Sequence, residues 1–101
     1  MENVTLTTKE RQMCRALLNT NTETDRYGDA VCWAREVDWP SSNGRTRILH
    51  KLHEKHVVDL AWNRRTRKDR EPFQPLWRDV VEEGWEVGFN ADTLRALIGG
   101  K

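Results

Sequence analysis

Apolar residues follow helical spacing near the start of the chain. Within residues 7–19, Met13 and Leu17 lie four positions apart, so they would share the buried face of a helix. Thr7 stands at the beginning of this segment and Glu10 follows three positions later, which is the spacing of a capping box. The pattern predicts a first helix over 7–19.

A similar spacing recurs in residues 29–38, "DAVCWAREVD". Val31, Ala34 and Val37 are three positions apart and would fall on one side of a helix. Pro40 follows at once, and the residue before a proline avoids the helical region of the backbone. The pattern predicts a second helix over 29–38 that ends before Pro40.

The third helical pattern lies in "SSNGRTRILHKLHEKH", residues 41–56. Two serines can cap it, and Ile48, Leu49 and Leu52 form a narrow apolar stripe. We therefore expect a helix over 42–55. Its opposite face would carry the polar residues Asn43, Arg47, His50, Lys51 and Glu54.

From residue 57 on, the spacing of apolar residues first predicts strands and then a last helix. Residues 57–62, "VVDLAW", combine β-branched and aromatic side chains with near alternation, which predicts a strand. Residues 75–89 fit either the returning strand of a hairpin or a short helix. Residues 90–98 predict a C-terminal helix that Asn90 or Asp92 can cap.

At this point the chain resembles the winged helix-turn-helix family over roughly residues 8–88. The resemblance lies in "DAVCWAREVDWPSSNGRTRILHKLHEKHVVDLAW". Ala34 stands where the family has a small residue in its second helix. Leu49 and Leu52 match the two spaced leucines of its recognition helix, and Val57 stands at the entry to its first wing strand.

The resemblance implies a small α+β domain with three helices, a two- or three-stranded wing hairpin and a short C-terminal helix. The chain departs from the family pattern at two positions. His56 stands where the family usually has glycine after the recognition helix, and Arg45 stands where it usually has an apolar residue. The expected layout is one domain over 1–101, with the helix-turn-helix at 29–56, the wing region at 57–88 and the last helix at 90–98.

Charge is distributed unevenly along the chain, although the net charge is only +1. Residues 35–70 contain ten Lys and Arg against five Asp and Glu, whereas residues 71–101 contain three against six. Five of the cations lie within "RRTRKDR", residues 64–70. Such asymmetry favours a role for the basic segment in contacting a partner.

The resemblance and the charge together predict sequence-specific binding of double-stranded DNA, as in a small transcriptional regulator. The helix 42–55 would enter the major groove, and a basic wing tip at 63–71 would contact the phosphate backbone or the minor groove. A homodimer through helices 8–19 and 91–98 would raise the affinity. The expected DNA-binding residues are Asn43, Arg45, Thr46, Arg47, His50, Lys51, Arg64, Arg65, Arg67, Lys68 and Arg70.

Other interpretations of the same residues stay open at this level. The basic run fits a solvated loop or a surface for an acidic protein as well as a nucleic-acid contact. The acidic last third and the small size also fit a non-enzymatic protein-binding module, such as a phage-type inhibitor or an adaptor. RNA is a third class of partner, although the RNA-binding sequence signatures are missing.

The cysteines, histidines and tryptophans do not predict a further functional site. Cys14 and Cys32 are expected to be buried and reduced, as in a cytoplasmic protein, rather than joined as a disulfide. The three histidines at 50, 53 and 56 turn too far around a straight helix to hold one metal ion easily. We expect no catalytic site, cofactor, metal or membrane segment, and most of the five tryptophans are expected in the core.

Overall fold

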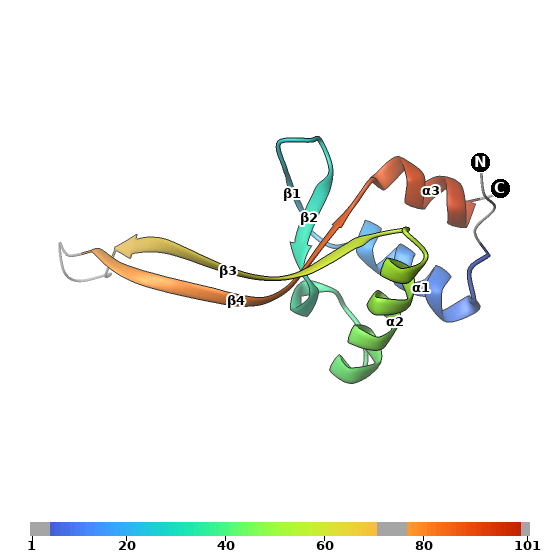
Figure 1. The fold of residues 1–101 in the computed structure, drawn as a ribbon, viewed down its shortest axis with the longest axis horizontal. Coiled ribbons are helices and arrows are strands. Elements are labelled where there is room, and N and C mark those ends of the chain that lie inside the picture. Colours follow the sequence, from blue (N-terminus) through green and yellow to red (C-terminus); the bar gives the residue numbers. More distant parts are fainter. Residues whose placement is uncertain (1–4, 71–76, 100–101) are drawn as a thin grey trace.

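The computed structural model describes residues 5–70 and 77–99, and shows an α+β fold in which helices pack against an antiparallel sheet (Figure 1). The predicted α+β class is therefore confirmed. The elements in chain order are α1 (Thr8–Leu18), β1 (Glu23–Thr24), β2 (Ala30–Trp33), the 3-10 turn η1 (Ala34–Glu36), α2 (Ser42–Glu54), β3 (Asp59–Arg70), β4 (Trp77–Phe89) and α3 (Ala91–Gly99).

The sheet has the order β1-β2-β4-β3, and all neighbouring strands are antiparallel. Val87 of β4 lies opposite Cys32 of β2 and Leu60 of β3, so these three buried residues form one row on the face that the helices cover. The helices complete the core with side chains that are fully or nearly fully buried. These include Met13, Cys14, Leu17, Leu49, Leu52 and Leu94.

The predicted starts of the three helices are confirmed by their N-caps. Glu10 N donates to Thr7 Oγ1 over 3.2 Å, and Thr7 N donates to Glu10 Oε1 over 2.9 Å, which completes the capping box of α1. Ser41 Oγ accepts from the backbone N–H of Gly44 at the start of α2. Asn90 Oδ1 accepts from the backbone N–H of Thr93 at the start of α3.

The predicted helix over 29–38 is wrong, because this segment forms strand β2 and the single turn η1. Ala34 and Val37 are buried as the helical spacing required, but Val31 lies on the opposite side of the sheet from buried Cys32. Strand β4 offers four pairing positions to β2. Pairing with this strand overrides a weak helical pattern that contains β-branched and aromatic residues.

The basic stretch is also different from the expected wing tip. Residues 63–70 are not a flexible loop but belong to β3, which continues to Arg70. Residues 77–89 form the returning strand β4, so the strand alternative holds there and the helix alternative is wrong. The paired strands form an arm that extends away from the helices (Figure 1), and the molecule measures 54 × 29 × 21 Å. The last residue of the predicted tip, residue 71, lies outside the described residues.

The end of α2 uses a left-handed residue, as the family resemblance implies, but the residue is histidine. His56 has a φ of 62°. Its N–H donates to the carbonyl of His53 over 3.0 Å, and the N–H of Val57 donates to the carbonyl of Leu52 over 2.9 Å. These two bonds are those of a Schellman motif, which normally takes glycine at the left-handed position. They direct the chain from α2 into β3.

A salt bridge fixes the same end of α2 against α1. Lys55 Nζ lies 2.6 Å from Glu10 Oε1 and 2.7 Å from the carbonyl oxygen of Thr5. Burial by itself would raise the pKa of Glu10, but the hydrogen bonds from Lys55 and Thr7 and the charge of Lys55 hold this pKa below its usual range. The ionised form of Glu10 therefore stabilises the fold.

We expect His56→Gly to stabilise the protein by about 0.5–1 kcal/mol, because a left-handed conformation is strained for a residue with a Cβ atom. The matched control is Lys51→Gly, at an exposed position inside α2, which should destabilise the protein by about 1 kcal/mol. Urea unfolding measures both changes. A loss of stability in His56→Gly would contradict the assigned strain.

We expect Glu10→Gln to lower the free energy of unfolding at pH 7 by about 1–2 kcal/mol, because the uncharged side chain loses its attraction to Lys55. Since the folded pKa lies below the usual value of 4.5, the contribution of Glu10 is complete above that pH and is lost as the pH falls through the folded pKa. Unfolding measured from pH 7 to pH 3 should show the difference between the two proteins closing below about 4.5. A constant difference over this range would contradict the prediction.

Candidate nucleic-acid interface

The exposed side of α2 carries polar side chains that are free to meet a ligand. Asn43, Arg47 and Lys51 are exposed, and they repeat every four residues along one stripe of the helix. Within the described part of the chain, none of these three side chains has a hydrogen-bond or ion-pair partner. A stripe of one amide and two cations can meet both phosphates and base edges.

Two other predicted contact residues on α2 are already engaged by the protein. Arg45 is half-buried, and its Nη1 donates to the carbonyl of Val37 over a long 3.4 Å, whereas its Nε is buried without a partner. Thr46 is also half-buried, and its hydroxyl donates to the carbonyl of Ser42. Arg45 therefore attaches α2 to the segment before it, at the position where the family resemblance implies an apolar residue.

The hairpin β3–β4 meets α2 through three aromatic rings, which we call the aromatic corner: His50, Trp85 and Trp62. The rings of His50 and Trp85 lie 4.9 Å apart at an interplanar angle of 83°. Trp62 lies opposite Trp85 across the hairpin, with ring centres 5.5 Å apart at 90°. Both contacts are edge-to-face, the arrangement that aromatic pairs favour. Trp62 is nevertheless 56% exposed.

The positive charge of β3 is balanced by its neighbour. Strands β3 and β4 together contain six Lys and Arg and six Asp and Glu, so the paired strands carry no net charge. The register places Arg64 opposite Glu83 and Arg65 opposite Glu82. Opposite charges across a strand pair stabilise the pair. The basic run is therefore one half of a balanced hairpin rather than an isolated patch of positive charge.

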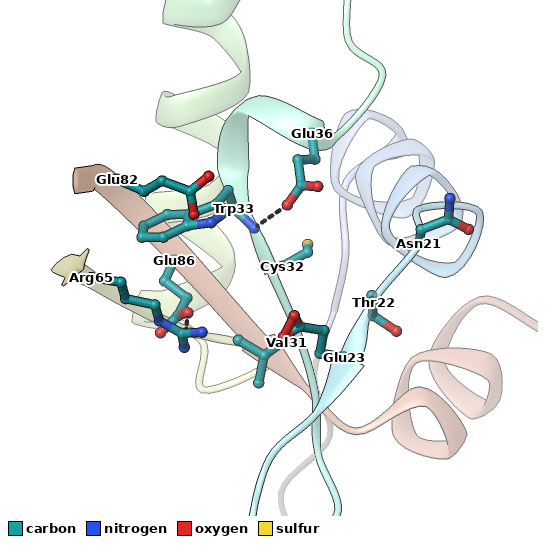
Figure 2. Close-up of a pocket in the computed structure, with 10 residues that line it drawn as sticks. All are labelled: Asn21, Thr22, Glu23, Val31, Cys32, Trp33, Glu36, Arg65, Glu82 and Glu86. Atoms are coloured by element: carbon teal, nitrogen blue, oxygen red, sulfur yellow. Dashed lines mark hydrogen bonds and ion pairs between the residues drawn. The ribbon is translucent and has the colours of Figure 1, made fainter. Parts of the chain in front are cut away.

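Arg65 is held on the side of the sheet that the helices leave open (Figure 2). It forms an ion pair with Glu86, which also accepts a hydrogen bond of 2.6 Å from Asn63 Nδ2. The guanidinium of Arg65 lies 5.7 Å from the ring centre of Trp33, and that of Arg35 lies 4.6 Å from the same centre. These contacts occupy Arg65 within the protein.

A pocket lies beside Trp33 on this open side (Figure 2). Four of its lining residues are glutamates, against the single cation Arg65. The carboxylate of Glu36 accepts a 2.9 Å hydrogen bond from the backbone N–H of Trp33. The negative character of this pocket opposes phosphate binding, so the side of the hairpin that faces α2 is the better candidate for a nucleic-acid contact.

The cations of β3 have a second physical role, because β3 is one of the two edge strands of the described sheet. An edge strand of 12 residues exposes unpaired backbone groups to any other chain. Lys and Arg side chains on such an edge repel the same edge of another copy and so reduce aggregation. Edge protection therefore explains part of the basic run without a ligand.

The predicted DNA-binding residues thus separate into groups. Asn43, Arg47 and Lys51 on α2 and Arg64 on β3 are exposed and have no side-chain partner within the described ranges. His50 is half-buried in the aromatic corner. The residues with protein partners are Arg45, Thr46 and Arg65, and the side chains of Arg67, Lys68 and Arg70 lie outside the described part.

Sequence reasoning missed the aromatic corner. It placed most tryptophans in the core, but among the described side chains only Trp39 and Trp85 pack against the core, and both are half-buried. Trp33 is half-buried outside it, and Trp62 is exposed. The side chain of Trp77 lies outside the described part. The signal that would have found the corner is the alternation of Leu60 with Trp62 in β3, since a strand longer than the core must carry its inward face into solvent.

Cysteine and histidine side chains lie in separate surroundings. Cys14 and Cys32 are unpaired and buried, and burial raises the pKa of each thiol to about 11, which keeps both protonated at neutral pH.

His53 Nδ1 lies 3.2 Å from the carbonyl oxygen of Val58. Residues 5–70 and 77–99 contain no group of three metal-ligating side chains, and their helices include none long and apolar enough to cross a membrane.

Comparison with known proteins adds no relative. No protein-family model, curated protein sequence or solved structure matches this chain.

We expect Arg45→Met to raise the free energy of unfolding by about 1 kcal/mol, because it removes a buried, unpartnered Nε and keeps the length of the side chain. The matched control is Arg47→Met, two residues further on an exposed face, which should change stability by less than about 0.5 kcal/mol. Thermal and urea unfolding measure both. If Arg45→Met is strongly destabilising, its bond to Val37 contributes more than its burial costs.

Proposed function

We propose that this chain binds double-stranded DNA, with α2 entering the major groove. The observation that carries the proposal is the exposed stripe of Asn43, Arg47 and Lys51, whose side chains have no partner among the described residues. Asn and Arg are suited to base edges, and Lys and Arg are suited to phosphates. The stripe lies on a helix held by its cap and by the Lys55–Glu10 salt bridge, so the side chains are presented by a rigid support.

The proposed architecture is a winged helix-turn-helix in which the second helix is shortened to the turn η1. Support comes from the order of elements, because η1 is followed by α2 and then by the hairpin β3–β4. The left-handed residue after α2 also supports it, since this is the position where the resemblance implies glycine. A small transcriptional regulator acting as a homodimer is the corresponding biological role, because one small module gives limited affinity.

The hairpin would contribute less positive charge than the basic run alone suggests. Arg65 is held by Glu86, whereas Arg64 is exposed and points to the same side of the hairpin as Trp62. We therefore assign the phosphate contact of the arm to Arg64 within the described residues. Phosphate contacts by α2 and Arg64 would be few, which predicts modest affinity for random sequence and a moderate dependence on salt.

The test is a salt titration of binding to random-sequence duplex DNA, measured by the anisotropy of labelled DNA. Wild-type protein should bind at low salt, and Arg47→Met should weaken binding and reduce the salt slope by about one. The matched variant is Arg45→Met, because the guanidinium of Arg45 faces the protein and not solvent. This variant should leave the DNA affinity and its salt slope nearly unchanged. If Arg47→Met and Lys51→Met both bind like the wild type, α2 does not contact DNA.

A second candidate function is a protein-binding module, and one observation favours it. The arm carries no net charge, and β2 pairs with β4 only over residues 86–89, so both long edges of the described arm beyond this point lack a neighbouring strand. Free strand edges can accept a strand from a partner. Recovery of one stoichiometric protein partner after nuclease treatment, with no DNA binding at low salt, would favour this function over the first.

A further inference from the structure

The most exposed feature of the hairpin that the proposed function does not use is Trp62. It is 56% exposed, although the indole is among the most hydrophobic side chains and the positions that follow it in β3, Asn63 and Arg64, are polar or charged. Trp85 supports it from across the strand pair, and His50 supports Trp85 from α2. The indole is therefore held by packing on one side and open to solvent on the other.

The surroundings of Trp62 indicate what kind of ligand it suits. Arg64 lies two residues further along the same face of β3, a separation of roughly 7 Å along a strand. Its side chain is exposed and has no partner within the described part of the chain. An aromatic face beside a free guanidinium matches a nucleotide, since the base can stack on the indole while the phosphate meets the cation.

The position of Trp62 relative to α2 limits how a base could reach it. His50 belongs to α2 and contacts Trp85, so the aromatic corner joins the proposed recognition helix to the arm. A base in an intact duplex is stacked between its neighbours and cannot present its face to an indole. A base without a partner strand can leave the stack at small cost, and this is the form that Trp62 can accept.

We infer that the aromatic corner is a stacking site for an unpaired nucleobase, with Trp62 as the platform and Arg64 as the phosphate contact. This inference rests on the proposed function and specifies its substrate: duplex DNA with a short single-stranded gap or an unpaired base next to the segment that α2 binds. Trp85 contacts the indole of Trp62 and acts as a positioning residue, and His50 supports Trp85 from α2.

The test compares two labelled probes of the same sequence, an intact duplex and the same duplex with a short gap in one strand. Wild-type protein should bind the gapped probe about tenfold more tightly, in line with the free energy of stacking one base on an aromatic ring. Trp62→Ala should abolish this preference and retain affinity for the intact duplex. Trp62→Phe should keep most of the preference, because a smaller ring still stacks.

The control is Tyr27→Ala, which removes an aromatic side chain that is 80% exposed and also lies near an arginine, Arg26, but in the loop between β1 and β2. It should leave both affinities unchanged. A second measurement uses wild-type protein alone: a gapped probe with 5-bromouracil in the gap should crosslink on irradiation to the peptide that contains Trp62. This measurement covers the case in which Trp62→Ala does not fold.

The outcomes separate the inference from the proposed function. Equal affinity of wild-type protein for the two probes overturns the inference and leaves duplex binding in place. A preference for the gap that persists in Trp62→Ala, or a crosslink outside the Trp62 peptide, also overturns the inference alone. If the wild type binds neither probe at low salt, both the inference and the proposed function fail.

Discussion

The rest of the structure depends on the pairing of a basic strand with an acidic one. Strand β3 contains five Lys and Arg against two Asp, whereas β4 contains four Asp and Glu against one Arg. Their antiparallel register brings these charges together and permits an arm that is much longer than the core beneath it. The same register fixes Trp62 opposite Trp85, and through His50 it fixes the arm to α2.

Because of this pairing, the positive charges in the sequence do not by themselves indicate a ligand. A run of five cations predicts a ligand only if the cations are free, and at least Arg65 forms an ion pair with Glu86. Among the described residues of α2 and β3, three cations are exposed and unpartnered. Only Arg64 belongs to the basic run, whereas Arg47 and Lys51 lie on α2. The net charge of the hairpin strands is zero, so an interface on the hairpin would depend on individual exposed side chains and not on overall charge.

The sequence predicted those elements whose signals are local. The caps of α1, α2 and α3 depend on residues within one turn, and each observed cap was among the residues predicted for it. The segment 29–38 was predicted wrongly because its structure depends on pairing with β4, more than 50 residues away, which no local spacing reveals. The free stripe on α2 was predictable from helical spacing. The partners of Arg45 and Arg65 were not, since both depend on tertiary contacts.

The arm also has a mechanical consequence. Below the pair Trp33–Glu86 the sheet includes β2, whereas beyond it the described arm is a two-stranded ribbon. Bending stiffness falls where the number of strands falls, so motion of the arm should concentrate at the next pair, Trp62 and Trp85. Both indoles lie at this hinge, beside His50 of α2. Their contacts would therefore couple bending of the arm to the helix, and their fluorescence would report a change in this packing.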